Sequence, residues 1–390
     1  MPILPIKKDC CGCTACSQTC SHNAISMIPD EEGFLYPQVS EKCCVECGLC
    51  SRSCPILHYD NIASKDADPI EILGMENLNP KILHQSSSGG VFFQIAKNVI
   101  EKGGVVYGVI YDDEMTVRHK RVDKAEELCL FCGSKYVQSR LEDTFKDIKK
   151  DLQKDIFVLF SGTACQVDAL HLFLRKDYPK LITTDLICHG VPSPLMFSKY
   201  IDLLQRKYRS KVVWLNMRDK EKGWTREHHY RIYLQNGKSY FDNRHTNLWT
   251  KMYFSENISR PSCHVCRFTN YLRPSDITIA DFLWVEERYP EFYQGNGVSL
   301  VIVNTEKGKE IIEGIKDQFR HFVSDKEGCS QPCLHHPSPI SPRREQYWKD
   351  VYSLSFEKLV RKYHEYGLFD YYTRRFRIKV HNIRVKLLDL

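Results

Sequence analysis

The sequence has no long apolar run: nothing in its 390 residues approaches the roughly 20 consecutive apolar residues that a membrane-spanning helix needs. The first residues, MPILPIKKDCCGC, also lack the apolar stretch of a secretory signal and enter a cysteine cluster almost at once. Charge of one sign is not in large excess, because the formal net charge is only +6. We therefore expect an intracellular, cytoplasmic protein whose 42% of hydrophobic residues build ordinary globular cores.

Cysteine, by contrast, is abundant, with 18 residues. In a small secreted domain so many cysteines would predict disulfide bonds. This chain is large, and it groups its cysteines at the spacing of metal ligands. Thiolates bound to metal in a reducing compartment are therefore the better interpretation.

Composition divides the chain into four predicted segments. Residues 1–58 hold ten of the eighteen cysteines, which indicates a small cysteine-rich domain. Residues 59–79 are predicted to be a linker, because much of this stretch is polar and small. Residues 80–330 alternate β-branched runs with amphipathic helices, which predicts a larger mixed α/β domain. Residues 331–390 are Pro-rich at first, as in extended structure packed over a surface, and end in a basic helical tail.

The expected elements of the larger domain follow from apolar periodicity. One helix should begin after Gly90 and stop at Gly103, and a second should cover 163–176. Short β-branched runs predict strands at 105–112, 155–162, 181–188, 276–282 and 297–304.

Two runs of cysteines near the N-terminus share the spacing C-x2-C-x2-C-x3-C. They comprise Cys10, Cys13, Cys16 and Cys20, then Cys44, Cys47, Cys50 and Cys54. This is the pattern of two-cluster bacterial ferredoxins, in which the fourth cysteine of each run binds the other cluster. We therefore predict a ferredoxin-like domain with two 4Fe–4S clusters that moves electrons. One cluster would use Cys10, Cys13, Cys16 and Cys54, and the other would use Cys44, Cys47, Cys50 and Cys20.

Zinc is the alternative, since C-x2-C pairs also bind zinc. Two identical runs of four cysteines favour iron–sulfur clusters over zinc. Cys11 and Cys43 fall outside the register of both runs, and we expect them to be bystanders.

Two motifs in the larger domain suit a nucleotide cofactor. QSSSGG (85–90) places hydroxyls and glycines at a helix N-terminus, where free N–H groups and the helix dipole favour a phosphate. A plain helix cap is the alternative. GSKYVQS (133–139) offers a glycine, hydroxyls, a lysine charge and an aromatic face, with a surface turn as its alternative.

Four further cysteines lie in motifs of the larger domain. SGTACQ (161–166) joins a predicted strand to a helix, at the carboxyl end where α/β sheets bind ligands. Cys188-His189-Gly190 ends the next predicted strand, and PSCHVCRF (261–268) adds a C-x2-C pair. Together these cysteines could form one four-thiolate site. The alternative is that they are free buried cysteines.

In their order along the chain, GSKYVQS, SGTACQ, ICHGVPSP, the pair Cys263/Cys266 and SDITIADF resemble the coenzyme F420 hydrogenase/dehydrogenase beta-subunit family. The resemblance covers nearly the whole chain, including the double ferredoxin module that many members carry. It implies FAD binding and electron transfer between the flavin and 4Fe–4S clusters. The ligands that it implies for a third cluster are Cys165, Cys188, Cys263 and Cys266. The FAD contacts that it implies are Ser87, Ser88, Gly89, Gly90, Gly133, Ser134, Lys135, Tyr136 and Gln138.

The function that the resemblance implies is that of an FAD-dependent iron–sulfur oxidoreductase. Its partners would be a ferredoxin or a redox subunit and a two-electron substrate, either an F420-type coenzyme or another reducible small molecule. Two departures bear on the substrate: Ala164 stands where the family has proline, and the family's GDFW reads Ala-Asp281-Phe-Leu-Trp. The alternative function is a relay subunit that transforms no substrate itself.

The remaining signals concern histidine, the tail and nucleic acid. His189 could relay a proton or could only bind backbone carbonyls. The segment 374–388 predicts a basic amphipathic helix, which could contact a membrane surface or an acidic partner or pack on its own domain.

We expect no nucleic-acid partner: the sequence shows no nucleic-acid-binding module, and three clusters of about −2 each would offset the charge of +6. Four cysteines match no motif and receive no role: Cys129, Cys132, Cys329 and Cys333.

Overall fold

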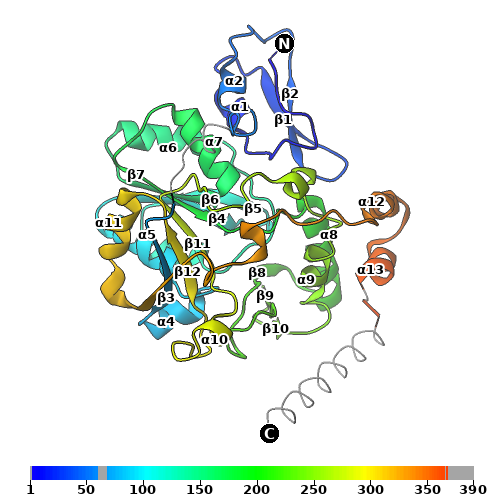
Figure 1. Ribbon diagram of the computed structural model, residues 1–390. Helices are drawn as coiled ribbons and strands as arrows, with labels where there is room; N and C mark the ends of the chain where they lie inside the picture. Colours follow the sequence, from blue (N-terminus) through cyan, green and yellow to red (C-terminus); the bar gives the residue numbers. More distant parts are fainter. Residues whose placement is uncertain (1, 60–67, 365, 368–390) are drawn as a thin grey trace.

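The computed structural model describes residues 2–59, 68–364 and 366–367, as a small N-terminal module on a larger body (Figure 1). In the module, strand β1 (Ile25–Pro29) pairs antiparallel with β2 (Leu35–Val39). Two short helices, α1 (Ala15–Gln18) and α2 (Leu49–Arg52), each carry the third cysteine of one run. The module lies at the top of Figure 1, above helices α6 and α7.

The two cysteine runs follow the same backbone course. Gly12 and Thr14 of the first run have φ angles of 71° and 62°, and the matching Glu46 and Gly48 of the second run have 55° and 72°. All four are therefore in the left-handed region, which turns the chain sharply before each short helix. The sequence repeat is thus also a structural repeat.

The body is built on an eight-stranded mixed sheet in the order β13-β3-β12-β11-β7-β6-β4-β5. Strands β4, β6, β7 and β11 run parallel to their neighbours within that group, and the other pairings are antiparallel. The predicted mixed α/β class is confirmed. The strands are β3 (Glu71–Asn77), β4 (Val105–Tyr111), β5 (Val117–Val122), β6 (Val158–Thr163), β7 (Leu181–Leu186), β11 (Ile277–Asp281), β12 (Ser299–Val303) and β13 (Phe319–Ser324).

Helices cover both faces of this sheet. Neighbouring residues of a strand point to opposite faces, so Val106 of β4 packs with Ile95 of α5 (Val91–Glu101), whereas Val105 packs with Phe173 of α7 (Ala164–Leu174). Helix α11 (Glu306–Glu313) joins α5 on its face, and α6 (Thr144–Gln153) joins α7. Both faces are therefore buried, which explains the nearly continuous apolar runs of the central strands.

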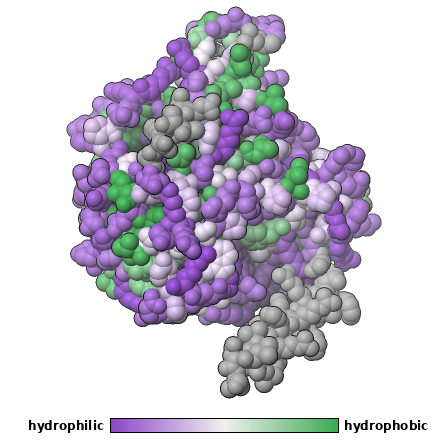
Figure 2. All heavy atoms as spheres, in the orientation of Figure 1, coloured by the Kyte–Doolittle hydropathy of each residue, from purple (hydrophilic) through white to green (hydrophobic). Residues whose placement is uncertain are grey.

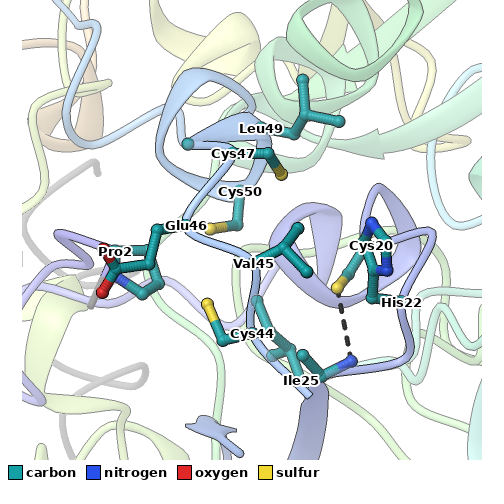
Figure 3. Close-up of a pocket in the computed structure, with 12 residues that line it drawn as sticks. Pro2, Cys20, His22, Ile25, Cys44, Val45, Glu46, Cys47, Leu49 and Cys50 are labelled. Atoms are coloured by element: carbon teal, nitrogen blue, oxygen red, sulfur yellow. Dashed lines mark hydrogen bonds between the residues drawn. The ribbon is translucent and has the colours of Figure 1, made fainter. Parts of the chain in front are cut away.

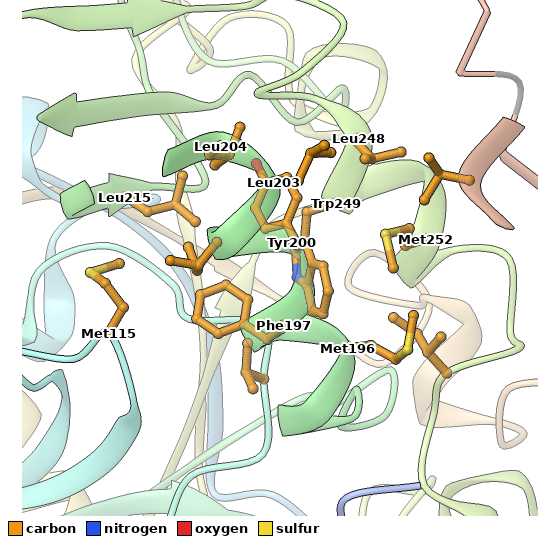
Figure 4. Packing of buried hydrophobic residues seen from close by; sticks show 14 of the residues in the cluster. Met115, Met196, Phe197, Tyr200, Leu203, Leu204, Leu215, Leu248, Trp249 and Met252 are labelled. Atoms are coloured by element: carbon orange, nitrogen blue, oxygen red, sulfur yellow. The ribbon is translucent and has the colours of Figure 1, made fainter. Parts of the chain in front are cut away.

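A second core lies beside the sheet. The small antiparallel sheet β8 (Val212–Asn216), β9 (Arg231–Leu234) and β10 (Ser239–Phe241) packs with helices α8 (Pro194–Tyr208) and α9 (Leu248–Tyr253). Figure 4 shows Trp249 and Tyr200 at its centre, where their rings stack at 5.5 Å. The other described elements are α4 (Pro80–Gln85), η1 (Ala125–Phe131), η2 (Pro261–Val265), α10 (Val285–Arg288), η3 (Lys316–Gln318), η4 (Pro332–Leu334), α12 (Arg344–Ser353) and α13 (Phe356–His364).

Two predicted segment boundaries are wrong. The proposed linker at 59–79 contains β3, which pairs with β12 and β13 inside the main sheet. The proposed separate segment at 331–390 contains α12 and α13, whose Tyr347 and Val360 are fully buried in the second core. In both cases long-range packing overrides a polar or Pro-rich local composition. The predicted basic helix at 374–388 lies outside the described residues.

The surface of the module carries apolar side chains. Figure 2 shows them in green on the module, and the exposed ones include Ile3, Ile6, Val45 and Leu57. Among the helices that the structure describes, none is both long enough and apolar enough to cross a membrane.

The second core makes a stability prediction. Replacing the fully buried Leu204 of α8 by alanine should lower the free energy of unfolding by about 2–5 kcal/mol, because the cavity is lined by packed side chains. The same change at Leu78, which is 57% exposed, should change it by less than about 0.5 kcal/mol. Urea titrations of the anaerobic protein would measure both, and equal effects would show that this core is not packed as described.

Candidate functional site

The N-terminal module contains two hollows lined by cysteine. The outer hollow is lined by Cys20, Cys44, Cys47 and Cys50 (Figure 3). The inner hollow is lined by Cys10, Cys13, Cys16 and Cys54, together with Cys11. Each encloses about 340 Å³, part of it open to solvent. The fourth cysteine of each run thus lines the hollow of the other run, and the structure brings together both crossed sets that the spacing indicates.

The two hollows differ in exposure. Cys10, Cys13 and Cys54 of the inner hollow are buried, whereas Cys47 of the outer hollow is exposed. Burial, together with the neighbouring thiols of Cys10 and Cys54, raises the pKa of Cys16 to about 12. A bound metal reverses this preference, because thiols that ligate a metal are deprotonated. In the outer hollow the backbone N–H of Ala24 donates to Cys20 Sγ at 3.3 Å, as the dashed line in Figure 3 marks.

A third group of cysteines lies at the carboxyl edge of the parallel strands. Cys165 is in the first turn of α7, directly after β6, and Cys188 lies two residues beyond β7. Burial raises the pKa of the Cys188 thiol well above its usual value, and the thiols of Cys263, Cys165 and Cys266 lie close enough to raise it further. The four cysteines from three separate motifs therefore form one group.

The start of α7 explains one departure from the family pattern. Thr163 caps the helix, with a reciprocal contact in which Gln166 Oε1 accepts from Thr163 N at 3.0 Å. Ala164 is the first helical residue, a position that proline favours because its missing N–H is not needed there. Alanine in place of the family's proline therefore leaves the start of the helix intact. Cys165 remains in the first turn of the helix, where contact with Cys11 and burial raise the pKa of its thiol well above the usual value.

Cys11 joins the module to the third group. Contact with Cys13 and burial raise the pKa of the Cys11 thiol well above its usual value, against the opposing effect of a contact with Cys165. Cys11, predicted to be a bystander, thus lies between the inner hollow and Cys165. Cys43 is exposed and lines neither hollow.

Within residues 2–59, 68–364 and 366–367, no three His, Cys, Asp or Glu side chains are placed so that together they could hold a single metal ion. Four thiolates around a four-iron cube stand farther apart than four around one ion, because each binds a different iron. The thiols of each cysteine group therefore lie near one another but do not meet at the position of a single metal ion.

The two loops predicted to hold a nucleotide cofactor touch each other. Ser134 N donates to Ser87 Oγ at 2.7 Å, and the two hydroxyls lie 2.9 Å apart. A side chain at Gly89 would stand 1.9 Å from the Met75 carbonyl oxygen, so only glycine fits where this loop crosses β3. Gly90, with φ of 85°, then caps α5. The two loops thus meet through Ser87 and Ser134 beside the start of an eleven-residue helix, while Ser88, Gly89 and Gly90 are buried.

Three of the predicted FAD contacts are used inside the protein. Ser88 Oγ donates to the Val298 carbonyl at 2.7 Å. The ammonium of Lys135 donates to three carbonyl oxygens, at 2.9, 3.1 and 3.2 Å, which uses all its N–H groups. The amide of Gln138 bonds Cys11 O and Arg260. Local carbonyls thus occupy Lys135, whereas residues distant in sequence occupy Ser88 and Gln138, and the three side chains stay predictions as flavin contacts.

Five aromatic rings connect the second of these loops with the third cysteine group. Tyr136 stacks on His228 at 5.1 Å and on Tyr253 at 5.2 Å. His189, next to Cys188, contacts Tyr253 at 5.3 Å and Phe254 at 5.2 Å, and Phe254 contacts His228 at 5.3 Å. The candidate flavin loop and the cysteine group are thus separated by one layer of aromatic rings.

Buried cations lie behind the glycine-rich loop. Arg218 donates to Asp281 Oδ2 at 2.8 Å and is 4% exposed, and Lys220 Nζ donates to the carbonyls of Ser88 and Leu83 at 2.6 and 2.7 Å. Burial lowers the pKa of Lys220 to about 7, against the opposing effect of Asp281. Among the described residues, Arg218 Nε and His228 Nδ1 are buried without a hydrogen-bond partner. Two orphaned polar atoms around Tyr136 fit a site for a polar, anionic ligand.

His189 is held from both sides. Its Nε2 lies 2.5 Å from Glu256 Oε1, and its Nδ1 lies 3.7 Å from Cys333 Sγ. Burial lowers the pKa of His189, but the contacts with Cys333 and Glu256 raise it to about 9.

Sequence reasoning missed Glu256, Cys333 and Tyr253, because none belongs to a recognisable motif. Cys129, Cys132 and Cys329 lie outside the three cysteine groups.

The fold and this site define a mixed α/β protein with thiols grouped as in redox-metal proteins. Residues 157–326 match the family described as the C terminus of the coenzyme F420 hydrogenase/dehydrogenase beta subunit. The matched segment carries all four cysteines of the third group, and the family it matches is the one that the motifs resemble. The N-terminal module and the loops at 85–90 and 133–138 lie outside the matched residues.

The chain was also compared with curated proteins and with solved structures. No curated protein matches the chain. Among solved structures, a chain of the F420-reducing [NiFe] hydrogenase complex from Methanosarcina barkeri is similar, with 16% identity and a TM-score of 0.45. The similarity covers 77% of this chain and 94% of that one.

The buried lysine makes a pH prediction. Folded Lys220 releases its proton near pH 7, whereas in the unfolded chain it does so near 10.5, so unfolding takes up a proton between these values and stability rises with pH there. Lys220→Met should reduce the slope of the free energy of unfolding against pH, between pH 7 and 8.5, by about one proton. Urea titrations at several pH values would measure it. The exposed Lys124→Met is the control, and equal slopes in the two variants would contradict the burial of a titrating lysine.

Proposed function

We propose that the chain is an iron–sulfur flavoprotein oxidoreductase that transfers electrons between a one-electron carrier and a two-electron substrate. The observation that carries the proposal is the arrangement of twelve cysteines in three neighbouring groups: the outer hollow, the inner hollow and the group at the sheet edge. The family of residues 157–326 supports a redox role.

The donor sets fit 4Fe–4S clusters. Each hollow of the module presents four thiols from two separate runs, as in two-cluster ferredoxins. The third group presents four thiols from α7, the end of β7 and η2, of which Cys165 and Cys188 lie at adjacent parallel strand ends. Cys10, Cys13, Cys16 and Cys54 would hold the inner cluster, Cys20, Cys44, Cys47 and Cys50 the outer one, and Cys165, Cys188, Cys263 and Cys266 the third.

The order of the groups supports a path for electrons. The outer hollow opens to solvent beside the exposed Val45, which leaves it accessible to a ferredoxin or a redox subunit. The inner hollow adjoins Cys165 through Cys11. The third group adjoins Tyr136 through Tyr253 and His189. Electrons that enter at the outer hollow would thereby reach the interior of the body.

FAD would bind beside Ser87, Gly133 and Ser134, which are partly exposed, with the buried Gly89 and Gly90 behind them. The start of α5 would receive the pyrophosphate, because helix N-termini bind phosphate groups. Arg218 adds positive charge behind the same loop, and Lys220 adds more below about pH 7. When bound, a flavin exchanges two electrons with a substrate and single electrons with clusters. Tyr136 would then lie between the cofactor and the third group.

The substrate would be a small molecule that accepts or donates two electrons. The family description names coenzyme F420, which makes an F420-type deazaflavin the first candidate. Asp281, in the altered GDFW motif, is held by Arg218, so the departure from the family pattern lies beside the proposed flavin surface. Another reducible small molecule remains the second candidate.

A relay subunit without its own substrate is the competing function. It is favoured by the internal use of Ser88, Lys135 and Gln138, which leaves fewer side chains for a flavin. The His189 side chain, held by Glu256 and Cys333, would serve to position the Cys188 segment in either case.

The third cluster makes a prediction about iron. Anaerobically purified wild type should contain about twelve irons per chain, and Cys263→Ser/Cys266→Ser should contain about eight, because one four-iron cluster loses two ligands. Cys129→Ser/Cys132→Ser is the matched control, since it removes a C-x2-C pair outside the three groups. Iron and zinc analysis would measure this. Unchanged iron in the first variant, or zinc in place of iron, would contradict the assignment.

The flavin surface makes a prediction about FAD. Ser87→Ala should weaken FAD binding about fivefold, because it removes the contact that joins the two loops. Ser86→Ala should leave it unchanged, because the Ser86 hydroxyl bonds only the Ile82 carbonyl of its own turn. Fluorescence titration of the flavin-depleted protein would measure both. If the wild type binds no FAD and yet passes electrons to a partner protein, the relay function replaces this proposal.

A further inference from the structure

Arg260 is a fully buried arginine between the module and the body. It is 0% exposed and directly precedes η2, which carries Cys263. Its Nε donates to the Cys10 carbonyl at 2.7 Å, its Nη1 to Gln138 Oε1 at 2.9 Å and its Nη2 to the Leu35 carbonyl at 3.0 Å. The side chain thus holds the first cysteine run and the module's hairpin against the body.

The charge of Arg260 has no carboxylate partner among the described residues. Its three acceptors are two carbonyls and an amide, and its guanidinium carbon also lies 4.2 Å from the ring of Tyr36 and 5.2 Å from that of Phe34. Burying an unpaired charge is costly, so opposite charge is expected nearby. The two nearest candidates are the inner hollow, through Cys10, and the third cysteine group, through Cys263, whose N–H donates to the Arg260 carbonyl at 2.9 Å. A cysteine-ligated 4Fe–4S cluster in either place would be anionic.

Gly12 shows how closely the two parts approach. A side chain there would stand 2.6 Å from Arg260 Nη1 and 2.7 Å from Gln138 Nε2. Gly48, in the second run, has almost the same φ, 72° against 71°, but nothing lies within 4 Å of a side chain built on it. The module therefore presents its first run to Arg260 and leaves the second run free.

We propose that Arg260 is a positioning residue that holds the inner cluster against the body and raises its reduction potential relative to the outer cluster. The inference rests on the proposed function, because it requires clusters in both hollows. A positive charge next to the inner cluster stabilises the reduced form, which carries one more negative charge. Electrons that enter at the outer cluster are thereby drawn toward the body.

The transfer itself is a simple exchange. One electron leaves the outer cluster, which is oxidised, and enters the inner cluster, which is reduced. No bond is made or broken, and no proton moves. The electron is supplied by a low-potential one-electron carrier, for which dithionite substitutes in the experiment.

The test uses four variants of the full chain, purified anaerobically. Arg260→Gln removes the charge, and Arg260→Lys keeps it without the planar fork of donors. Gly12→Ala keeps Arg260 but pushes its guanidinium away, and Gly48→Ala is the control with the same backbone strain and no contact. Redox titrations followed by EPR give the ratio of reduced to oxidised inner cluster at a fixed potential. A Cys13→Ser variant identifies the signal.

The expected results separate charge from structure. Arg260→Gln should keep the iron of the wild type and lower that ratio about tenfold, as expected for one poorly screened charge. Arg260→Lys should restore most of the ratio, and Gly12→Ala should lower it while Gly48→Ala does not. If Arg260→Gln loses iron, the ratios of reduced to oxidised inner cluster in Arg260→Lys and Gly12→Ala test the effect of the charge instead.

Two other outcomes would overturn the inference. A wild-type ratio in Arg260→Gln would show that the charge does not act on the cluster. Equal losses in Arg260→Gln and Arg260→Lys would show that only the fork matters. If the wild type itself holds no iron, the proposed function fails instead, so the two failures are distinguishable.

Discussion

The buried guanidinium of Arg260 ties together parts of the chain that are far apart in sequence. It reaches the Cys10 carbonyl, 250 residues away, and the Gln138 amide, 122 residues away. Cys10 lines the inner hollow, Gln138 ends the loop predicted to hold a cofactor, and Arg260 itself leads into the helix that carries Cys263. This one side chain, together with the absence of a side chain at Gly12, therefore helps to fix the relative placement of the inner hollow, that loop and the third cysteine group, alongside contacts such as Arg344 with Glu32.

The body supplies what a redox protein of this kind needs around the module. Parallel strands bring Cys165 and Cys188 to one edge of the sheet, and a layer of aromatic rings connects that edge with Tyr136. Part of the outer hollow is open to solvent. In the proposed function the outer hollow would be the entry for single electrons, and the interior of the body would hold the two-electron chemistry.

The sequence predicted the parts of this structure that local pattern determines. The strands at 105–111, 158–163, 181–186, 277–281 and 299–303 form because β-branched apolar runs fit a sheet covered on both faces. The crossed grouping of Cys20 and Cys54 was also predictable, since cysteine spacing is a local signal. Strand β3 was missed because a polar stretch precedes it and its partners lie more than 200 residues away.

The site was predictable only in part, for the same reason. Cys11 lies outside the cysteine register, yet its backbone turns it toward Cys165. Lys135 and Gln138 belong to a motif that suits a cofactor, but carbonyls and Arg260 occupy them. Glu256, Cys333 and Arg260 carry no motif at all. Contacts of this kind depend on tertiary packing, which spacing and periodicity do not encode.

The claim that the module feeds electrons to the body is tested most directly by rapid mixing. Full-length protein loaded with iron and FAD would be mixed anaerobically with a reduced ferredoxin, too large to reach a buried flavin, while flavin absorbance is followed. The account predicts flavin reduction in the wild type and its loss in Cys13→Ser, in which the outer cluster still becomes reduced. Equally fast flavin reduction in both proteins would contradict it.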